Sequence, residues 1–137
     1  MSKFLEDLFG FKDKTAVIIG GTGVLCGEMA QGLAQAGTGV VIVGRNPDKA
    51  AERISQIEKV GGRAYFHSCE VDKKENIQSL LDSVVERSGG VDIVVNGAGI
   101  NSPTPVLDIT EEEFQNILDI NLRAVFQSCQ VFGKYFL

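Results

Sequence analysis

The stretch VIIGGTGVLCGE, Val17–Glu28, runs from an apolar segment through a glycine-rich turn into a segment with helical spacing. Thr15–Ile19 is predicted to form a strand, and Val24–Ala36, with apolar residues three and four apart, a helix. Gly37 follows directly and is a typical signal for the end of a helix. The turn therefore joins a buried strand to a helix, which is the repeating unit of an α/β fold.

The glycines of this turn have two explanations. A helix that begins after a parallel strand offers unpaired N–H groups and the positive end of its dipole, and Gly20, Gly21 and Gly23 would clear room there for a pyrophosphate. A bare strand-to-helix turn that needs a positive φ is the alternative. A P-loop is disfavoured because no Gly-Lys-Ser/Thr follows.

The rest of the chain repeats the pattern of strand and helix. Three further apolar segments predict strands: Val40–Val43, Ala64–His67 and Val91–Val95. Three capping signals predict helices: Asn46 with Pro47 to about Val60, Asp72 with Glu75 to about Arg87, and Thr110 with Glu113 to the end of the chain. Strands that are apolar on both faces favour a parallel sheet covered by helices, so we predict a doubly wound α/β Rossmann fold of four βα units. We expect it to be incomplete, because the fourth strand would be an apolar edge and the chain ends in apolar helix.

Composition limits the classes of function. The 137 residues are enough for one domain, which we assign as a dinucleotide-binding Rossmann domain over residues 1–137. A net charge of −5 favours a small-molecule partner over nucleic acid, and no apolar run is long enough to cross a membrane. Three scattered cysteines have no metal-binding spacing and suit the cytoplasm. The first residues, with Phe4, Leu5, Leu8 and Phe9 among acids, predict a short amphipathic turn laid on the domain rather than a signal peptide.

The end of the second strand bears on the choice of dinucleotide. An acid at this place would indicate a free ribose 2′-hydroxyl, but the sequence has Gly44 followed by Arg45. An adjacent guanidinium suits a 2′-phosphate, so NADP(H) is favoured and NAD(H) is the alternative. A solvated surface arginine explains Arg45 equally well.

Two further sites carry polar or small residues in informative places. Asn96, Gly97, Ala98 and Gly99 follow the fourth strand, where a doubly wound sheet binds ligands, although an ordinary strand-to-loop turn is the alternative. Asn121 falls on the predicted apolar stripe of the last helix, and a buried amide must be hydrogen-bonded. It would either tie the helix to a strand backbone or hold a catalytic water or lysine.

Taken together, the glycine turn, NGAG at Asn96–Gly99 and DINL at residues 119–122 resemble the amino-terminal half of the short-chain dehydrogenase/reductase family. The family pattern Thr-Gly-x-x-x-Gly-x-Gly is matched by Gly20, with Val24 and Cys26 at the places of the second and third glycines. The variant turn and the NGAGINSP loop are similar to a subgroup of D-mannonate oxidoreductases, which are fructuronate reductase-like.

The resemblance implies a role for each matching residue. The cofactor-binding residues would be Gly20, Gly21, Thr22, Gly23, Val24 and Leu25 at the pyrophosphate, Arg45 at the 2′-phosphate, Glu70 and Val71 near the adenine, and Asn96, Gly97, Ala98 and Gly99 beside the nicotinamide ribose. Gly97 stands where the family has a second asparagine. Asn121 would be the catalytic asparagine, and no metal is implied. Intact members usually form homo-oligomers through the helix that carries this asparagine.

The resemblance also implies an activity. The intact protein would transfer a hydride between a nicotinamide and a carbonyl or alcohol substrate, such as the sugar acids D-mannonate and D-fructuronate. The family's Ser and Tyr-x-x-x-Lys have no counterpart in these 137 residues, so the chain alone is expected to be inactive. A non-catalytic dinucleotide-binding or interaction module is the alternative, and a methyltransferase is disfavoured by Gly44-Arg45.

Cys26 is the one cysteine with two interpretations. Its place at a helix N-terminus could lower the pKa of the thiol and make it oxidisable, with a bound cofactor as shield. Otherwise it is a small residue that fills the place of a glycine.

Overall fold

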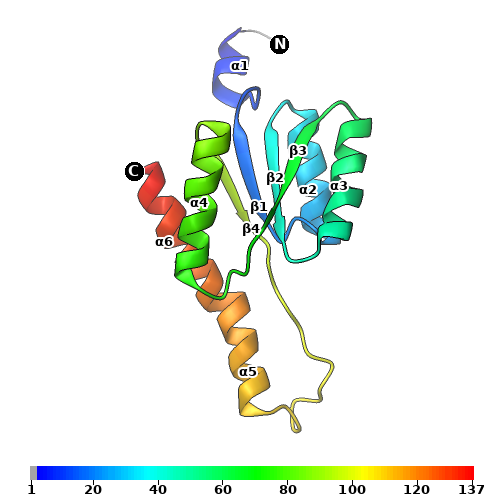
Figure 1. Ribbon diagram of the computed structural model, residues 1–137, viewed down its shortest axis with the longest axis vertical. Helices are drawn as coiled ribbons and strands as arrows, with labels where there is room; N and C mark the ends of the chain where they lie inside the picture. Colours follow the sequence, from blue (N-terminus) through cyan, green and yellow to red (C-terminus); the bar gives the residue numbers. More distant parts are fainter. Residues whose placement is uncertain (1–2) are drawn as a thin grey trace.

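The computed structural model describes residues 3–137, except for the side chain of Asp7. Helices and strands alternate along most of the chain (Figure 1). The helices are α1 (Lys3–Phe9), α2 (Val24–Gln35), α3 (Pro47–Lys59), α4 (Lys74–Ser88), α5 (Glu111–Leu118) and α6 (Ala124–Phe136), with a π-helical segment η1 (Asp119–Arg123) between the last two. The strands are β1 (Thr15–Ile19), β2 (Gly39–Gly44), β3 (Arg63–Ser68) and β4 (Ile93–Asn96).

The four strands form one parallel sheet in the order β3-β2-β1-β4, as the apolar strand pattern predicted. In register, Val17 of β1 lies between Val41 of β2 and Val94 of β4. The central strands β1 and β2 are buried on both faces, whereas every residue of the edge strand β4 is only partly buried. The predicted doubly wound fold and its apolar edge strand are therefore confirmed.

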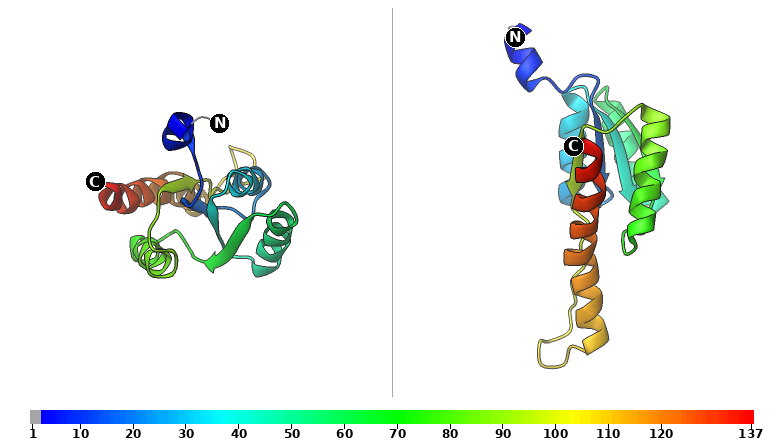
Figure 2. Two further views of the ribbon diagram at one scale, coloured as in Figure 1. Left: turned by 90° about the horizontal axis from the view of Figure 1, so that it is seen from above. Right: turned by 90° about the vertical axis from the view of Figure 1, so that its left-hand side faces the viewer.

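Helices cover both faces of the sheet, and each face has its own apolar core. Small and branched residues of α2 and α3, such as Ala30 and Ile57, pack on one face, which carries Ile18 and Ile42. Larger residues of α4 and α6 pack on the other face, among them Leu80 and the fully buried Phe132. Figure 2, seen from above, shows α2 and α3 together on one side of the strands and α4 across from them. This two-sided cover leaves the ends of the strands as the places where loops gather.

The capping predictions for α3 and α5 hold, but the one for α4 is wrong. Asn46 accepts a hydrogen bond from the N–H of Lys49, and Pro47 is the first residue of α3. The N-cap of α4 is Lys73 and no side chain caps it, so Asp72 lies one residue before the cap. The turn there is closed instead by the Asn76 side chain, whose Nδ2 donates to the carbonyl oxygen of residue 70 at 2.9 Å. A different local side-chain-to-backbone hydrogen bond thus replaces the predicted box.

The last helix is not continuous, contrary to prediction, because η1 inserts a π turn between α5 and α6. After η1 the buried face lies one residue earlier than predicted. The predicted stripe included Val125 and Cys129, whereas the buried residues of α6 are Ala124, Ser128, Val131 and Phe132, and Cys129 is exposed. Residues of the predicted stripe before η1 are also open, with Phe114 52% exposed. Asn121 lies within η1 and is exposed rather than buried, contrary to the predicted stripe.

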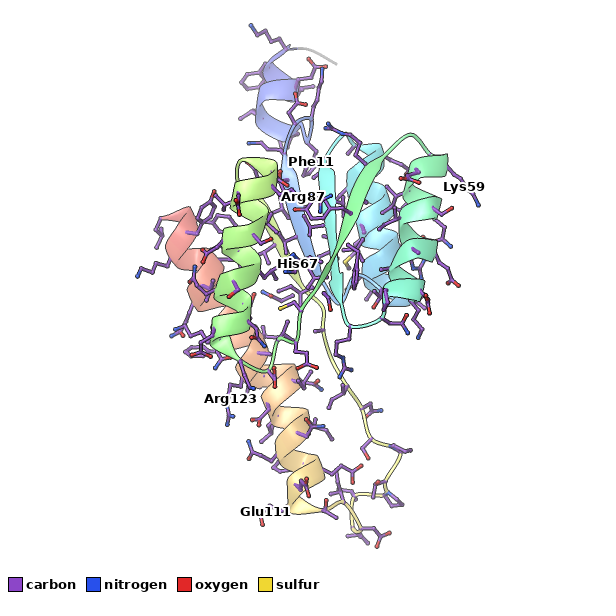
Figure 3. The ribbon with its side chains drawn as sticks, viewed as in Figure 1. Phe11, Lys59, His67, Arg87, Glu111 and Arg123 are labelled. Carbon is purple, nitrogen blue, oxygen red and sulfur yellow. The ribbon has the colours of Figure 1, made fainter. Side chains whose placement is uncertain are left out.

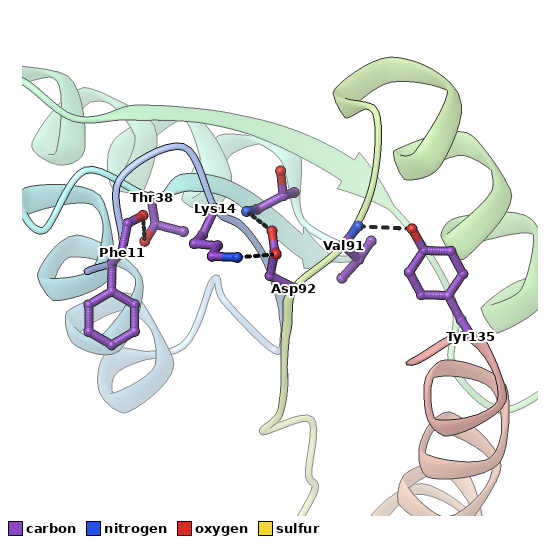
Figure 4. Close-up of polar contacts among 7 residues, drawn as sticks. Phe11, Lys14, Thr38, Val91, Asp92 and Tyr135 are labelled. Atoms are coloured by element: carbon purple, nitrogen blue, oxygen red, sulfur yellow. Dashed lines mark hydrogen bonds and ion pairs between the residues drawn. The ribbon is translucent and has the colours of Figure 1, made fainter. Parts of the chain in front are cut away.

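The end of the sheet opposite the glycine turn is closed by side-chain contacts between distant segments (Figure 4). Asp92 accepts hydrogen bonds from the Lys14 ammonium and from the backbone N–H of Thr15, both at 2.9 Å. Burial acts to raise the pKa of Asp92, but these hydrogen bonds outweigh it and lower the pKa below its usual value. The Tyr135 hydroxyl accepts a hydrogen bond from Val91 N at 3.4 Å, which ties α6 to the start of β4.

The amino-terminal helix α1 is not laid on the domain as predicted. It stands away from the sheet in Figure 1 and in both views of Figure 2. Its aromatic side chains Phe4 and Phe9 are 69% and 67% exposed, and Leu8 is 59% exposed. The amphipathic pattern predicted the helix itself but not where its apolar side lies.

Candidate dinucleotide-binding cleft

The glycine turn is closely packed at its first residue, Gly20, and leaves the helix N-terminus uncapped at its last, Gly23. Gly20 has φ +82°, and a Cβ there would lie 2.7 Å from the carbonyl carbon and oxygen of Gly97, so the turn needs glycine for two reasons. Gly23 is the N-cap of α2 and provides no side-chain cap. The first N–H groups of α2 therefore remain available to an acceptor at the end of the turn.

The turn opens into a cleft of about 520 Å³ at the carboxyl ends of the strands, a volume within the usual range for ligand pockets. Figure 1 shows α5 and the loop after β4 extending beyond this end of the sheet. Nine residues predicted to bind the cofactor line the cleft: Gly20, Thr22, Gly23, Arg45, Glu70, Val71, Gly97, Ala98 and Gly99. Lining residues from three strand ends and the α2 turn thus come together as the fold class predicts.

Five predicted site residues do not line the cleft. Gly21 is buried under the turn, where its N–H donates to the carbonyl oxygens of Ile18 and Val43. Val24 and Leu25 point away from the domain and are 77% and 69% exposed. Asn96 and Asn121, discussed below, are the other two.

Several lining residues were not predicted as site residues, among them Cys69, Asp72 and Asn116. Asp72 had been assigned to the helix cap, and its position just past β3 was the signal that could have placed it here. Cys69 follows the same strand and is buried, and burial together with the nearby acids Asp72 and Glu70 raises the pKa of its thiol. Asn116 belongs to α5, and nothing in its local sequence marks it, because the approach of that helix to the cleft is set by tertiary packing.

Arg45 lies where the cleft meets a second opening at the start of α3. This opening is lined by Thr22, Arg45, Asn46, Pro47, Asp48 and Lys49. Arg45 is exposed and forms no ion pair with any described residue. A Cβ at Gly44 would lie 3.0 Å from the Thr22 side chain, so an acid at that position would force Thr22 to move. The region therefore offers cations and a helix N-terminus to an anion.

The residues after β4 divide between the cleft and the core. Asn96 turns away from the cleft, and its Nδ2 lies 3.6 Å from Cys129 Sγ while its buried Oδ1 has no partner among described residues. Gly97, Ala98 and Gly99 line the cleft with backbone. A Cβ at Gly99 would come within 3.4 Å of Asn121 Oδ1. Small residues here let a ligand approach the main chain.

Asn121 ties η1 to the loop after β4. Its Oδ1 accepts a hydrogen bond from Ile100 N at 2.8 Å and its Nδ2 donates to Ile100 O at 2.9 Å. Of the two predicted roles for Asn121, the structure shows a backbone tie, although the tie is to a loop rather than a strand and the side chain is exposed. π-helical turns occur often at functional sites, and this one sets the position of the loop that borders the cleft.

The far end of the same loop is held to the start of α5. Thr110 accepts a hydrogen bond from Glu113 N, as its predicted role as N-cap requires. The Glu113 carboxylate accepts hydrogen bonds from the hydroxyls of Ser102 and Thr104, and a backbone hydrogen bond with Thr110, the second half of the predicted capping box, also acts on it. These hydrogen bonds lower the pKa of Glu113.

Cys26 is buried and His67 is partly buried, and burial shifts the pKa of both side chains. Cys26 is 7% exposed and burial raises the pKa of its thiol, which favours the interpretation of Cys26 as a small residue that fills the place of a glycine. His67 lies on β3 near Arg87 of α4, and both are labelled in Figure 3. Burial first and the Arg87 charge second lower the pKa of His67. Arg87 itself lies over the ring of Tyr65, 3.7 Å from its centre.

The described residues, 3–137, hold no group of three or more His, Cys, Asp or Glu side chains placed to bind a metal ion. None of the helices in that range has the length and hydrophobicity of a membrane span.

Residues 14–137 match the short chain dehydrogenase family. The uncharacterised oxidoreductase UxuB of Bacillus subtilis is 34% identical over 147 residues, which cover 96% of this chain and 52% of that protein. The 2-dehydro-3-deoxy-D-gluconate 5-dehydrogenase of Escherichia coli is 34% identical over 129 residues, covering 94% and 50%. The chain thus spans about half the length of these relatives, and their names do not establish the D-mannonate subgroup.

Solved structures show the same fold. A short-chain type dehydrogenase/reductase from Mycobacterium marinum superimposes with a TM-score of 0.87 at 35% identity, covering 96% of this chain and 52% of that one. An NAD⁺-bound xylitol dehydrogenase gives 0.82 at 26% identity, covering 88% and 47%. Because the family match begins at residue 14 and continues to residue 137, and the relatives share the fold, the chain belongs to the short chain dehydrogenase family of NAD(P)-dependent oxidoreductases.

Proposed function

We propose that this chain is the dinucleotide-binding part of an oxidoreductase that transfers a hydride between a nicotinamide and a carbonyl or alcohol carbon. The observation that carries the proposal is the cleft of about 520 Å³ into which the uncapped start of α2 opens. The residues present fit a dinucleotide, because Gly20 and Gly23 leave the turn free of side chains and the α2 N–H groups suit a pyrophosphate. When bound, the cofactor supplies the hydride chemistry.

The chain's own residues would bind and orient that cofactor. Gly20, Thr22 and Gly23 would surround the pyrophosphate, and Glu70 and Val71 would border the adenine. The Gly97–Gly99 backbone would support the nicotinamide ribose. Of the predicted pyrophosphate residues, Val24 and Leu25 would act only through backbone N–H groups, because their side chains point away from the cleft.

NADP(H) is the favoured cofactor and NAD(H) the alternative. Arg45 has no ion-pair partner among described residues, and Lys49 lines the same opening at the start of α3. An exposed cation pair beside a helix N-terminus suits the 2′-phosphate that distinguishes the two cofactors. Asp48 in the first turn of α3 opposes this preference only in part, because two cations face one acid.

Calorimetry on the full-length protein tests both statements. We expect NADPH to bind, and Arg45→Gln to raise its Kd by roughly tenfold or more while the Kd of NADH changes little. Arg63→Gln is the matched control, because Arg63 is exposed at the opposite end of β3 and loses the same charge. No binding of either cofactor by wild type contradicts the proposed function. An equal effect of Arg45→Gln on both cofactors contradicts the NADP(H) preference alone.

Asn121 would contribute to catalysis as the asparagine of the catalytic group, and the tie to Ile100 would hold it at the border of the cleft. For the substrate we favour a sugar acid such as D-mannonate or D-fructuronate. Support comes from a 34% identical relative named for 2-dehydro-3-deoxy-D-gluconate. Steady-state rates of the full-length protein with sugar acids, polyols and simple secondary alcohols test this. A preference for simple alcohols contradicts it, and cofactor binding without turnover of any of them favours a non-catalytic module.

Homo-oligomer formation is a further part of the proposal. Leu118, Leu122 and Phe126 line a shallow groove on the outer side of α5, η1 and α6, and Leu122 and Phe126 are 65% and 60% exposed. Exposed apolar side chains in one groove favour burial against another subunit. Light scattering of the full-length protein should give a multiple of the monomer mass, and Leu122→Glu should reduce it. A monomeric wild type contradicts this part.

A further inference from the structure

Gly97 is a glycine for a reason other than its backbone conformation. Gly20, Gly37, Gly61 and Gly89 are the described glycines with positive φ, and Gly97 is not among them. Its backbone therefore accepts an ordinary L-residue. The obstacle is a side chain, because a Cβ at Gly97 would overlap the sulfur of Cys26.

The sulfur of Cys26 is held where it is by its surroundings. Cys26 is the third residue of α2 and is buried in the apolar core formed with Ala16 and Ile18 of β1. Burial keeps the thiol neutral by raising its pKa, so it behaves as a small apolar group. A helical residue has few alternative rotamers, and the overlap cannot be relieved by a small rotation.

The Gly97 peptide is enclosed from a second side by the glycine turn. A Cβ at Gly20 would lie 2.7 Å from the Gly97 carbonyl and 2.8 Å from Ala98 N. The Gly97 N–H donates to the carbonyl oxygen of Ile19 at 2.9 Å. Gly20, Gly97 and Ala98 all line the cleft, so the atoms that fix the Gly97 peptide also fix the cleft wall.

We propose that Cys26 is a positioning residue of the cleft, and that Cys26 and Gly97 form a matched pair in which the sulfur occupies the volume of the missing Cβ. The sulfur holds the Gly97–Ala98 backbone against the Gly20 turn. Both residues stand where the sequence departs from the family pattern quoted above, and the structure places the two departures in contact. The effect on cofactor affinity rests on the proposed function, whereas the steric pairing does not.

A double-mutant cycle on the unliganded full-length protein tests the pairing. Gly97→Ala adds a methyl group where the sulfur lies, and we expect it to lower the midpoint of thermal unfolding by roughly 5 °C. Cys26→Ala removes the sulfur, and the double variant moves the same volume from α2 to the loop. In the Cys26→Ala background, Gly97→Ala should lower the unfolding midpoint by less than about half as much as it does in wild type. An equal cost in both backgrounds overturns the pairing.

Gly32→Ala is the matched control for the glycine substitution. Gly32 lies on α2, as Cys26 does, and a Cβ there meets nothing within 4 Å. Because alanine favours a helix, this variant should unfold at the same or a higher temperature. Maleimide labelling followed by peptide mapping gives a second readout: Cys26 should be protected in wild type and label faster in Gly97→Ala. Unchanged protection of Cys26 in that variant contradicts the overlap.

Cofactor affinity tests the positioning role separately. Each single variant should raise the Kd of NADPH by roughly tenfold, and the double variant should return it to within about threefold of wild type. If the variants couple in stability but bind NADPH like wild type, the pair is structural and the positioning role is overturned. If wild type binds neither NADPH nor NADH, the proposed function fails and the positioning role with it, while the unfolding cycle still decides whether the residues are paired.

Discussion

Replacing Gly20 by alanine measures how tightly the turn at the cleft is built. At φ +82°, an L-residue costs about 1 kcal/mol more than glycine. The added Cβ would also lie 2.7 Å from the backbone of Gly97, and overpacking of this kind costs roughly 1–3 kcal/mol. We therefore expect Gly20→Ala to lower the free energy of unfolding by about 2–4 kcal/mol, a large part of the ~5–15 kcal/mol typical of a domain.

The chain offers a control with the same backbone strain and no collision. Gly89 also has φ +82°, and a Cβ there meets nothing within 4 Å. Gly89→Ala should therefore cost only about 1 kcal/mol. Both variants are compared with wild type by urea unfolding followed by circular dichroism, with the slope of the transition checked for two-state behaviour. Equal losses in the two variants would refute the collision between Gly20 and Gly97.

Three further predictions concern groups outside the glycine turn. Asp92→Asn should lower the free energy of unfolding by about 1 kcal/mol at neutral pH. Because the folded pKa of Asp92 is lowered, this difference from wild type should shrink as the pH falls below about 4. Urea titrations that give the same difference at every pH contradict this prediction. Burial and the Arg87 charge lower the folded pKa of His67, so the free energy of unfolding of wild type should fall as the pH drops below about 6.5. His67→Gln should make this dependence on pH weaker. Parallel plots of unfolding free energy against pH for the two proteins would disprove this. Asn121→Ala removes both hydrogen bonds to Ile100, and hydrogen exchange of the Ile100 amide should speed up by roughly tenfold, whereas unchanged protection would show that the tie is dispensable.

Several features of the site depend on how segments distant in sequence meet. The predicted apolar stripe of the last helix differs by one residue from the face that is buried after η1, and the residue spacing did not indicate the π turn itself. Asp72 was misassigned for a local reason, since the Asn76 side chain closes the turn before α4 by donating to the carbonyl oxygen of residue 70. Of the two interpretations of Cys26, burial favours the small residue that fills the place of a glycine, because it raises the pKa of the thiol, and no local pattern reports burial.

The sequence by itself determined the order of strands and helices, the parallel sheet and the place of the glycine turn, because these follow from local periodicity and from residues that only a turn accepts. Six of the nine predicted cleft residues were placed in the same way, since parallel strands bring their carboxyl ends to one edge, whereas Thr22, Glu70 and Val71 were implied only by the resemblance to the family. Only the tertiary structure decided that Val24 and Leu25 point outward, that Asn121 binds the Ile100 backbone, and that Cys26 fills the space beside Gly97. These depend on the packing of segments far apart in the chain, where a difference of one atom decides which side chain fits.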